Sequence, residues 1–159
     1  MKKIFTQIAV AFGCLFLAGC DTVFDVHPYD VHVDGDKNVN AANIAKIESA
    51  IKYKDTIRFA MISDTHQWLD DLKKEVNDIN RRKDSIDFVL HCGDVTDFGA
   101  TQEFQWTRDR LQKLKMPFVV LLGNHDCLGT GNQTYEVVFG KPDSVLHTFS
   151  YLGTTVVTR

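Results

Sequence analysis

The chain has 159 residues, 44% of them hydrophobic and 25% charged, which is ordinary for one globular domain and enough to bury a core. Its formal net charge is −3 at pH 7. Because this balance lacks the basic surplus that binds a phosphate backbone, a nucleic-acid scaffold role is not expected.

The first twenty residues are typical of a targeting segment. Lys2 and Lys3 precede an apolar run over residues 8–16 that is too short for a good membrane span. The next four residues, Leu17-Ala18-Gly19-Cys20, resemble the cleavage site of a bacterial lipoprotein signal. That resemblance implies cleavage before Cys20, lipid on its thiol and an anchor in the inner or outer membrane of a bacterial cell envelope. The alternative is an ordinary signal peptide with a chance cysteine.

We predict three segments: a signal peptide over residues 1–19, a tether over 20–40 and a domain over 41–159. The tether is expected because its residues show no sustained apolar run. Outside the signal and the lipidation site, the cysteines are Cys92 and Cys127. A disulfide between them is conceivable in an envelope compartment, but packing as two small residues is the preferred interpretation.

The first helix of the domain is predicted over residues 40–52. Asn40 is a good N-cap residue, and the spacing that follows places Ile44, Ile47 and Ile51 on one face. This helix is therefore expected to dock on a sheet through its isoleucines.

Three β-rich apolar runs, at residues 57–63, 86–92 and 117–122, predict buried strands. The two segments between the strands have helical periodicity, and Thr101 is expected to be the N-cap of the second of these crossover helices. Alternating strands and helices with right-handed crossovers form a parallel sheet, so the predicted fold class is α/β.

The C-terminal part of the chain has weaker patterns. A short helix is predicted around residues 134–139, and one or two strands are predicted within residues 146–158.

Each predicted strand of the sheet ends in a polar motif. The first leads into Asp64-Thr65-His66, the second into Gly93-Asp94-Val95-Thr96-Asp97 and the third into Gly123-Asn124-His125-Asp126. The carboxyl ends of parallel strands lie at one edge of an open α/β sheet, which is where such sheets bind ligands. We therefore expect the three motifs to form one site.

The side chains of these motifs suit divalent metal ions. Carboxylates, imidazoles and amide oxygens are hard or borderline ligands that favour Mn, Fe or Zn. Asp64 and His66 lie two residues apart and can face one ion, whereas Asp94 has two oxygens and can bridge a pair of ions. Asn124 would then bind the second ion, and His125 is free to donate a proton.

Together the motifs resemble those of the calcineurin-like metallophosphoesterases, which carry Asp-x-His, Gly-Asp-x-x-Asp and Gly-Asn-His-Asp/Glu in this order. The resemblance covers about residues 57–126. It implies a metal-dependent hydrolase of phosphate esters with two divalent ions, in which a metal-activated hydroxide attacks phosphorus. It also implies that the chain forms the βαβαβ half of an αββα sandwich.

The resemblance assigns a role to each matching position. Four residues would bind the metals: Asp64 and His66 the first ion, Asp94 both ions, and Asn124 the second. His125 would contact the phosphate and protonate the leaving oxygen, with Asp126 as its orienting partner. Asp97 would support the metal ligands from behind without touching an ion.

The resemblance is incomplete after the third motif. The family has later histidines there, and this chain has only His147. We interpret His147 as a cross-strand residue and His91 as a packing residue. The sequence therefore looks like the N-terminal portion of a larger enzyme, and the chain alone is expected to be weakly active or inactive.

Two functions of different classes remain after this reasoning. One is a phosphoesterase, and the other is a lipid-anchored binding or scaffold protein that retains half a metal site. The substrate also stays open among monoesters, diesters, nucleotides and lipid headgroups, because selectivity usually comes from the loops around a site.

Overall fold

The structure, a computed structural model, describes residues 27–141, 148–151 and 154–157. The predicted signal peptide, the lipidation site Cys20 and His147 lie outside the described residues. Within the described ranges, no helix is both long and apolar enough to cross a membrane.

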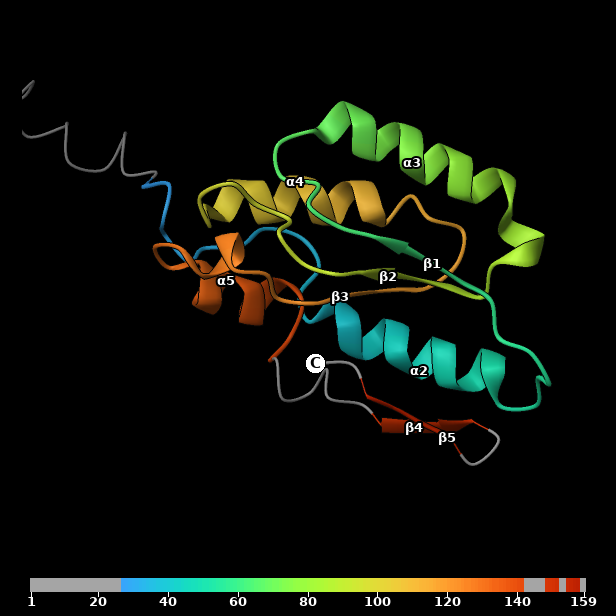
Figure 1. Ribbon diagram of the computed structural model, residues 1–159. Helices are drawn as coiled ribbons and strands as arrows, with labels where there is room; N and C mark the ends of the chain where they lie inside the picture. Colours follow the sequence, from blue (N-terminus) through green and yellow to red (C-terminus); the bar gives the residue numbers. More distant parts are fainter. Residues whose placement is uncertain (1–26, 142–147, 152–153, 158–159) are drawn as a thin grey trace, which may run out of the picture.

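The domain is built on a parallel sheet of three strands in the order β1-β2-β3 (Figure 1). The strands are β1 (Phe59–Ile62), β2 (Phe88–His91) and β3 (Phe118–Val120). Helix α3 (Leu69–Arg81) joins β1 to β2, and α4 (Thr101–Leu111) joins β2 to β3. The predicted α/β fold class and its βαβαβ order are confirmed.

Helices cover both faces of the sheet (Figure 1). On the face of α3 and α4, Val89 and Val120 pack in one core with Leu72, Phe104 and Leu111. This arrangement agrees with the nearly continuous apolar character of the strands, because a parallel sheet buries both faces.

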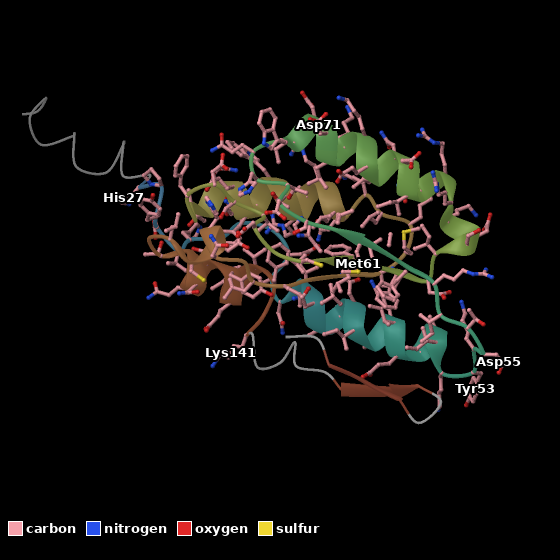
Figure 2. The ribbon with its side chains drawn as sticks, in the orientation of Figure 1. His27, Tyr53, Asp55, Met61, Asp71 and Lys141 are labelled. Atoms are coloured by element: carbon pink, nitrogen blue, oxygen red, sulfur yellow. The ribbon has the colours of Figure 1, made fainter. Side chains whose placement is uncertain are left out.

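Helix α2 (Val39–Ile51) lies on the opposite face and packs its three isoleucines against Phe88 and Val119, as the spacing predicted. Its cover does not extend to β1. Phe59 is 49% exposed and Met61 is 62% exposed, although Phe59 stacks on Phe88 with ring centroids 5.1 Å apart. Figure 2 labels Met61 on this strand.

Two predicted N-caps are wrong. Helix α2 begins at Val39, and Asn40 is buried at 1% exposure with its amide on the main chain of β3: Nδ2 donates to Val120 O at 2.8 Å and Oδ1 accepts from Val120 N at 2.9 Å. Thr101 is the first residue of α4 and not its cap, which is Ala100. Thr101 Oγ1 donates to Asp30 O, so each of these polar side chains binds a residue far along the chain and does not cap its helix as local propensity suggested.

Residues 27–38, which belong to the predicted tether and precede α2, pack along the domain. Val33 belongs to the core on the α4 face. The buried guanidinium of Arg108 donates from Nη1 to the carbonyl oxygens of Asp34 and Asp36, at 2.6 and 3.0 Å. We call residues 27–38 the N-terminal arm.

After β3 the chain forms two short helices and a hairpin. These elements are η2 (His125–Cys127), α5 (Gly131–Val138), β4 (Thr148–Tyr151) and β5 (Thr154–Val157). The hairpin strands are antiparallel, and α5 begins three residues before the predicted helix. A further 3₁₀ turn, η1 (Lys83–Ser85), precedes β2.

Candidate metal centre

The motif loops after β1 and β2 have an unusual backbone. Asp64, His66 and Asp94 have φ angles of 55°, 42° and 55°, a region that residues other than glycine seldom adopt. Two main-chain hydrogen bonds hold the loops in this conformation: Asp64 N donates to Gly93 O and His66 N donates to Asp94 O, each at 3.1 Å. These strained turns bring the side chains of both loops together at one point beyond the carboxyl ends of the strands.

Three predicted metal ligands converge at that point. One ligand atom from each of Asp64, His66 and Asp94 lies within 4.8 Å of the other two. Asn124 lies beside them, with its Nδ2 3.2 Å from Asp94 Oδ2 when the amide is oriented to donate. The two carboxylates and the imidazole form a donor set that fits Mn, Fe or Zn.

The hydrogen bonds of His66 prepare it to bind a metal. Its Nδ1 lies 3.0 Å from Thr96 O and 3.0 Å from Asp97 Oδ1. Because a carbonyl oxygen only accepts, Nδ1 carries the proton and Nε2 keeps its lone pair for a metal. Asp97 therefore contacts the back of a candidate ligand, which is the kind of support that orients histidines in metal sites.

Two glycines allow the second and third motif loops to touch. Gly93 has a φ of 100°, and a Cβ added to it would lie 2.7 Å from Gly123 Cα. A Cβ added to Gly123 would overlap the main-chain N and the Oδ1 of Asp94. Any larger residue would push the loops apart, so the glycines set the distance between Asp94 and the Asn124-His125 pair.

His125 lies at the edge of the ligand cluster. Its ring stands edge-on to that of His66, with centroids 4.9 Å apart, and its Nδ1 donates to Asp97 O at 2.9 Å. The pKa of His125 is raised above its ordinary value, mainly by this hydrogen bond and also by the charges of Asp94 and Asp97, against the opposing effect of burial. The geometry leaves Nε2 as the nitrogen that can exchange a proton with a ligand.

Asp126 makes hydrogen bonds that differ from those expected. We expected it to orient His125, but its buried carboxylate accepts from Thr96 N (3.0 Å) and Thr96 Oγ1 (2.9 Å) at Oδ1, and from Gly123 N (3.0 Å) at Oδ2. The physical reason is burial: a carboxylate removed from water needs several donors, and the two motif loops supply them. Among the described residues, the hydrogen-bond partner of the His125 ring is the Asp97 carbonyl.

A comparison with protein families decides the identity of this domain. The family model for calcineurin-like phosphoesterase matches residues 57–156, which contain all three motifs. The chain belongs to this family. The match confirms the predicted family resemblance and fits the observed α/β sheet.

Two curated relatives match shorter parts of this phosphoesterase domain. A probable glycerophosphodiester phosphodiesterase of Arcobacter nitrofigilis is 40% identical over 48 residues, which are 30% of this chain and 18% of that protein. A probable cyclic nucleotide phosphodiesterase of Xenorhabdus bovienii is 25% identical over 68 residues, which are 42% of this chain and 26% of that protein. Each match spans about a quarter of the relative's length or less.

His91 is buried and holds the first two motif loops of the domain together. Gly93 N donates to its Nδ1 at 3.2 Å, so the other nitrogen, Nε2, carries the proton and donates to Thr65 Oγ1 at 2.9 Å. Desolvation lowers the pKa of His91 to about 4. With both nitrogens engaged, His91 offers no lone pair to a metal, which agrees with its interpretation as a packing residue.

Glu103 is a site residue that the sequence analysis missed. It is 5% exposed, and its carboxylate accepts from the main-chain N–H groups of Asp97, Phe98 and Ala100 at 2.9–3.2 Å, and from Gln67 Nε2 at 2.8 Å. It therefore fixes the loop that carries Asp97. Its position near the start of α4, where the carboxylate of a capping box stands, was an available signal.

The two cysteines near the motifs are free thiols. Cys127 donates from Sγ to Gly123 O at 3.2 Å, and Cys92 is half-buried at the end of β2. The conceivable disulfide between them is not formed in the structure.

Proposed function

We propose that this protein is a metal-dependent hydrolase of phosphate esters, and that phosphodiesters are its first substrate class to test. The convergence of Asp64, His66 and Asp94 within 4.8 Å is the observation that carries the proposal. Support for diesters comes from the two relatives, both of which are named as phosphodiesterases.

The family resemblance supplies the proposed ligand roles, and the convergence of three ligand atoms supports them. Asp64 and His66 would hold the first ion, Asp94 would contribute to both sites, and Asn124 would hold the second ion. When bound, two divalent ions would supply an activated water as nucleophile and would neutralise the charge on the phosphoryl oxygens. With this assignment the described residues would supply three ligands to the first ion and two to the second.

His125 is the proposed proton donor to the leaving oxygen. Its ring lies beside His66, and its raised pKa keeps the imidazolium form populated at a higher pH than an ordinary histidine would. The contact between Nδ1 and the Asp97 carbonyl fixes the ring. Asp97 and Asp126 act through other residues, the first by contacting His66 and His125 and the second by holding Thr96 and Gly123.

The test combines metal binding with turnover in the full chain. Wild type and Asp94→Asn are titrated with Mn²⁺ or Zn²⁺ by calorimetry and assayed with bis(p-nitrophenyl) phosphate and p-nitrophenyl phosphate. Asp71→Asn, on the outer surface of α3 (Figure 2), is the matched control. We expect wild type and the control to bind metal and to turn over the diester slowly, and Asp94→Asn to lose both properties.

The remaining outcomes separate the two candidate functions. Metal binding without turnover of either ester would favour a lipid-anchored binding or scaffold protein. Metal affinity that is the same in wild type and Asp94→Asn would show that the proposed ligand set is wrong.

We also propose that Cys20 anchors the protein to a bacterial membrane through lipid. The support is the sequence of residues 17–20 behind a basic start and an apolar run. Cys20→Ala should abolish labelling with a radioactive fatty acid, whereas Cys14→Ser should leave it intact. Equal labelling of the two variants would exclude Cys20 as the acceptor.

A further inference from the structure

A pocket of about 460 Å³ opens beside β3, between the first half of α2 and the turn that joins α4 to β3. Its lining includes no residue of the three motifs. The pocket borders the N-terminal end of β3, whereas the motifs follow the C-terminal ends of the strands. It is therefore a cavity separate from the metal centre.

Asn43 of α2 is the polar residue that makes this pocket unusual. It is 6% exposed and lines the cavity, yet its side-chain amide has no hydrogen-bond partner among the described residues. Asn40, one turn earlier, is buried as well, but its amide forms two hydrogen bonds with the main chain of Val120. Buried amides without a partner are rare and unfavourable, so Asn43 indicates a group that enters the pocket and binds it.

The main chain of Phe118 adds further polar groups to the same pocket. Val89 is opposite Phe118 in the parallel register, and Val89 N donates to Pro117 O. In such a ladder the N–H and C=O of Phe118 are directed away from β2, toward the edge where Asn40 binds Val120. No described residue pairs with them.

The charged residues that line the pocket indicate an anionic ligand. Three lysines, Lys37, Lys46 and Lys115, line the pocket, and none of them forms an ion pair within the described part of the chain. The one acidic lining residue, Asp36, accepts a hydrogen bond from Gln112 Nε2 at 2.8 Å. The lining thus combines an excess of positive charge with the hydrogen-bonding groups of Asn43 and Phe118.

We propose that this pocket binds a small phosphate-bearing anion, with the phosphate held by the three lysines and a polar group of the ligand held by the Asn43 amide. The volume suits a small molecule more than a single water. The pocket does not suit an added β-strand. Asn40 already binds the main-chain groups of Val120, so on the three-residue β3 only the N–H and C=O of Phe118 are left to pair with another strand.

The test uses the full chain, isotopically labelled and kept free of metal with a chelator, and inorganic pyrophosphate as the probe. NMR follows the side-chain NH₂ signals of Asn43, and calorimetry gives the affinity. We expect saturable binding that shifts these signals and weakens as ionic strength rises. Pyrophosphate that leaves the Asn43 signals unmoved at saturation would overturn the proposal.

Variants assign the binding to the pocket. Lys46→Gln and Lys115→Gln should each weaken pyrophosphate binding about two- to fivefold, and Asn43→Leu about tenfold. Lys52→Gln, at the other end of α2 and outside the lining, and Asp94→Asn, in the metal centre, should bind as wild type does. Unchanged affinity in a variant that combines Lys46→Gln and Lys115→Gln, or lost affinity in Asp94→Asn, would also refute the proposal.

Discussion

Asp126 and Thr96 are joined by two hydrogen bonds to a single buried oxygen, which Thr96 reaches with both its main-chain N–H and its hydroxyl. The two residues stand thirty positions apart, in the loops that follow β2 and β3. The second oxygen of Asp126 accepts from Gly123 N. One carboxylate thus links the loop of Asp94 to the loop of Asn124 and His125, whose close approach the two glycines allow.

The first prediction is that Asp126→Asn loosens both loops without removing the proton donor. The amide keeps an oxygen for Thr96 but turns an NH₂ group toward Gly123 N–H, so a donor faces a donor. We expect the free energy of unfolding to fall by about 2–3 kcal/mol in urea denaturation. The affinity for Mn²⁺ should fall with it, because Asp94 and Asn124 lose their fixed spacing.

Asp84→Asn is the matched control, since Asp84 is exposed on η1, and its unfolding free energy should stay within about 0.5 kcal/mol of wild type. The role expected from the sequence predicts another pattern. If Asp126 oriented His125, the variant would keep its stability and instead shift the pH profile of hydrolysis.

The second prediction concerns acid stability and His91. Burial holds the pKa of His91 at about 4 in the folded state, against an ordinary 6.5. Between these values the unfolded chain binds a proton that the folded chain does not, so stability is lost as pH falls. The loss from this residue should reach about 3 kcal/mol between pH 6.5 and 4.

Urea unfolding at a series of pH values measures this loss. His91→Gln removes the titrating group and should flatten the dependence across that window, whatever its stability at pH 7. His32→Gln changes an exposed histidine of the N-terminal arm and should leave the slope as in wild type. An equally steep slope in His91→Gln would place the acid sensitivity elsewhere.

Local sequence predicted the elements and the place of the site. Apolar runs and helical spacing are properties of short segments, so the three strands, α2, α3 and α4 could be located within a few residues. The convergence of Asp64, His66 and Asp94 followed from a general rule, because parallel strands bring their carboxyl ends to one edge.

Contacts between distant residues could not be predicted in this way. Asn40 has the propensity of an N-cap, but two hydrogen bonds to Val120, eighty residues away, place it inside α2. The N-terminal arm is polar and resembles a tether, but Arg108 binds its carbonyl groups, which composition does not reveal. Sequence patterns show which side chains are apolar. They do not show which main-chain groups a polar side chain will bind.

The third prediction is that Arg108→Lys releases the N-terminal arm. The guanidinium binds the two carbonyl oxygens through Nη1 while its Nε and Nη2 donate to Asp109 Oδ1, and a lysine lacks the planar fork that makes these contacts together. We expect amide hydrogen exchange in the arm to accelerate about 10- to 100-fold, including that of Asp34, whose N–H donates to Gln105 Oε1.

Arg110→Lys is the matched control on the same helix, because the Arg110 guanidinium donates to the carbonyl of Trp106 one turn earlier and makes no hydrogen bond to the arm among the described residues. Its arm should exchange as in wild type. Equal protection of the arm in Arg108→Lys would mean that Val33 and the remaining hydrogen bonds suffice to hold it.

The last prediction separates proton donation by His125 from metal binding. The link of His125 to Asp94 runs through its main-chain N–H, at 2.8 Å, and survives any substitution of the side chain. His125→Gln should therefore keep its affinity for Mn²⁺ while turnover falls about 10²- to 10⁴-fold. In wild type, activity should decline as pH rises through the raised pKa of His125, because the imidazolium is the donor.

The leaving group provides the sharpest readout of this role. A p-nitrophenolate departs without a proton, whereas an alkoxide needs one, so His125→Gln should lose far more activity toward an alkyl diester than toward bis(p-nitrophenyl) phosphate. His27→Gln, in the N-terminal arm (Figure 2), should behave as wild type with both substrates. An equal loss toward both substrates, together with reduced metal content, would instead make His125 a residue that maintains the metal centre.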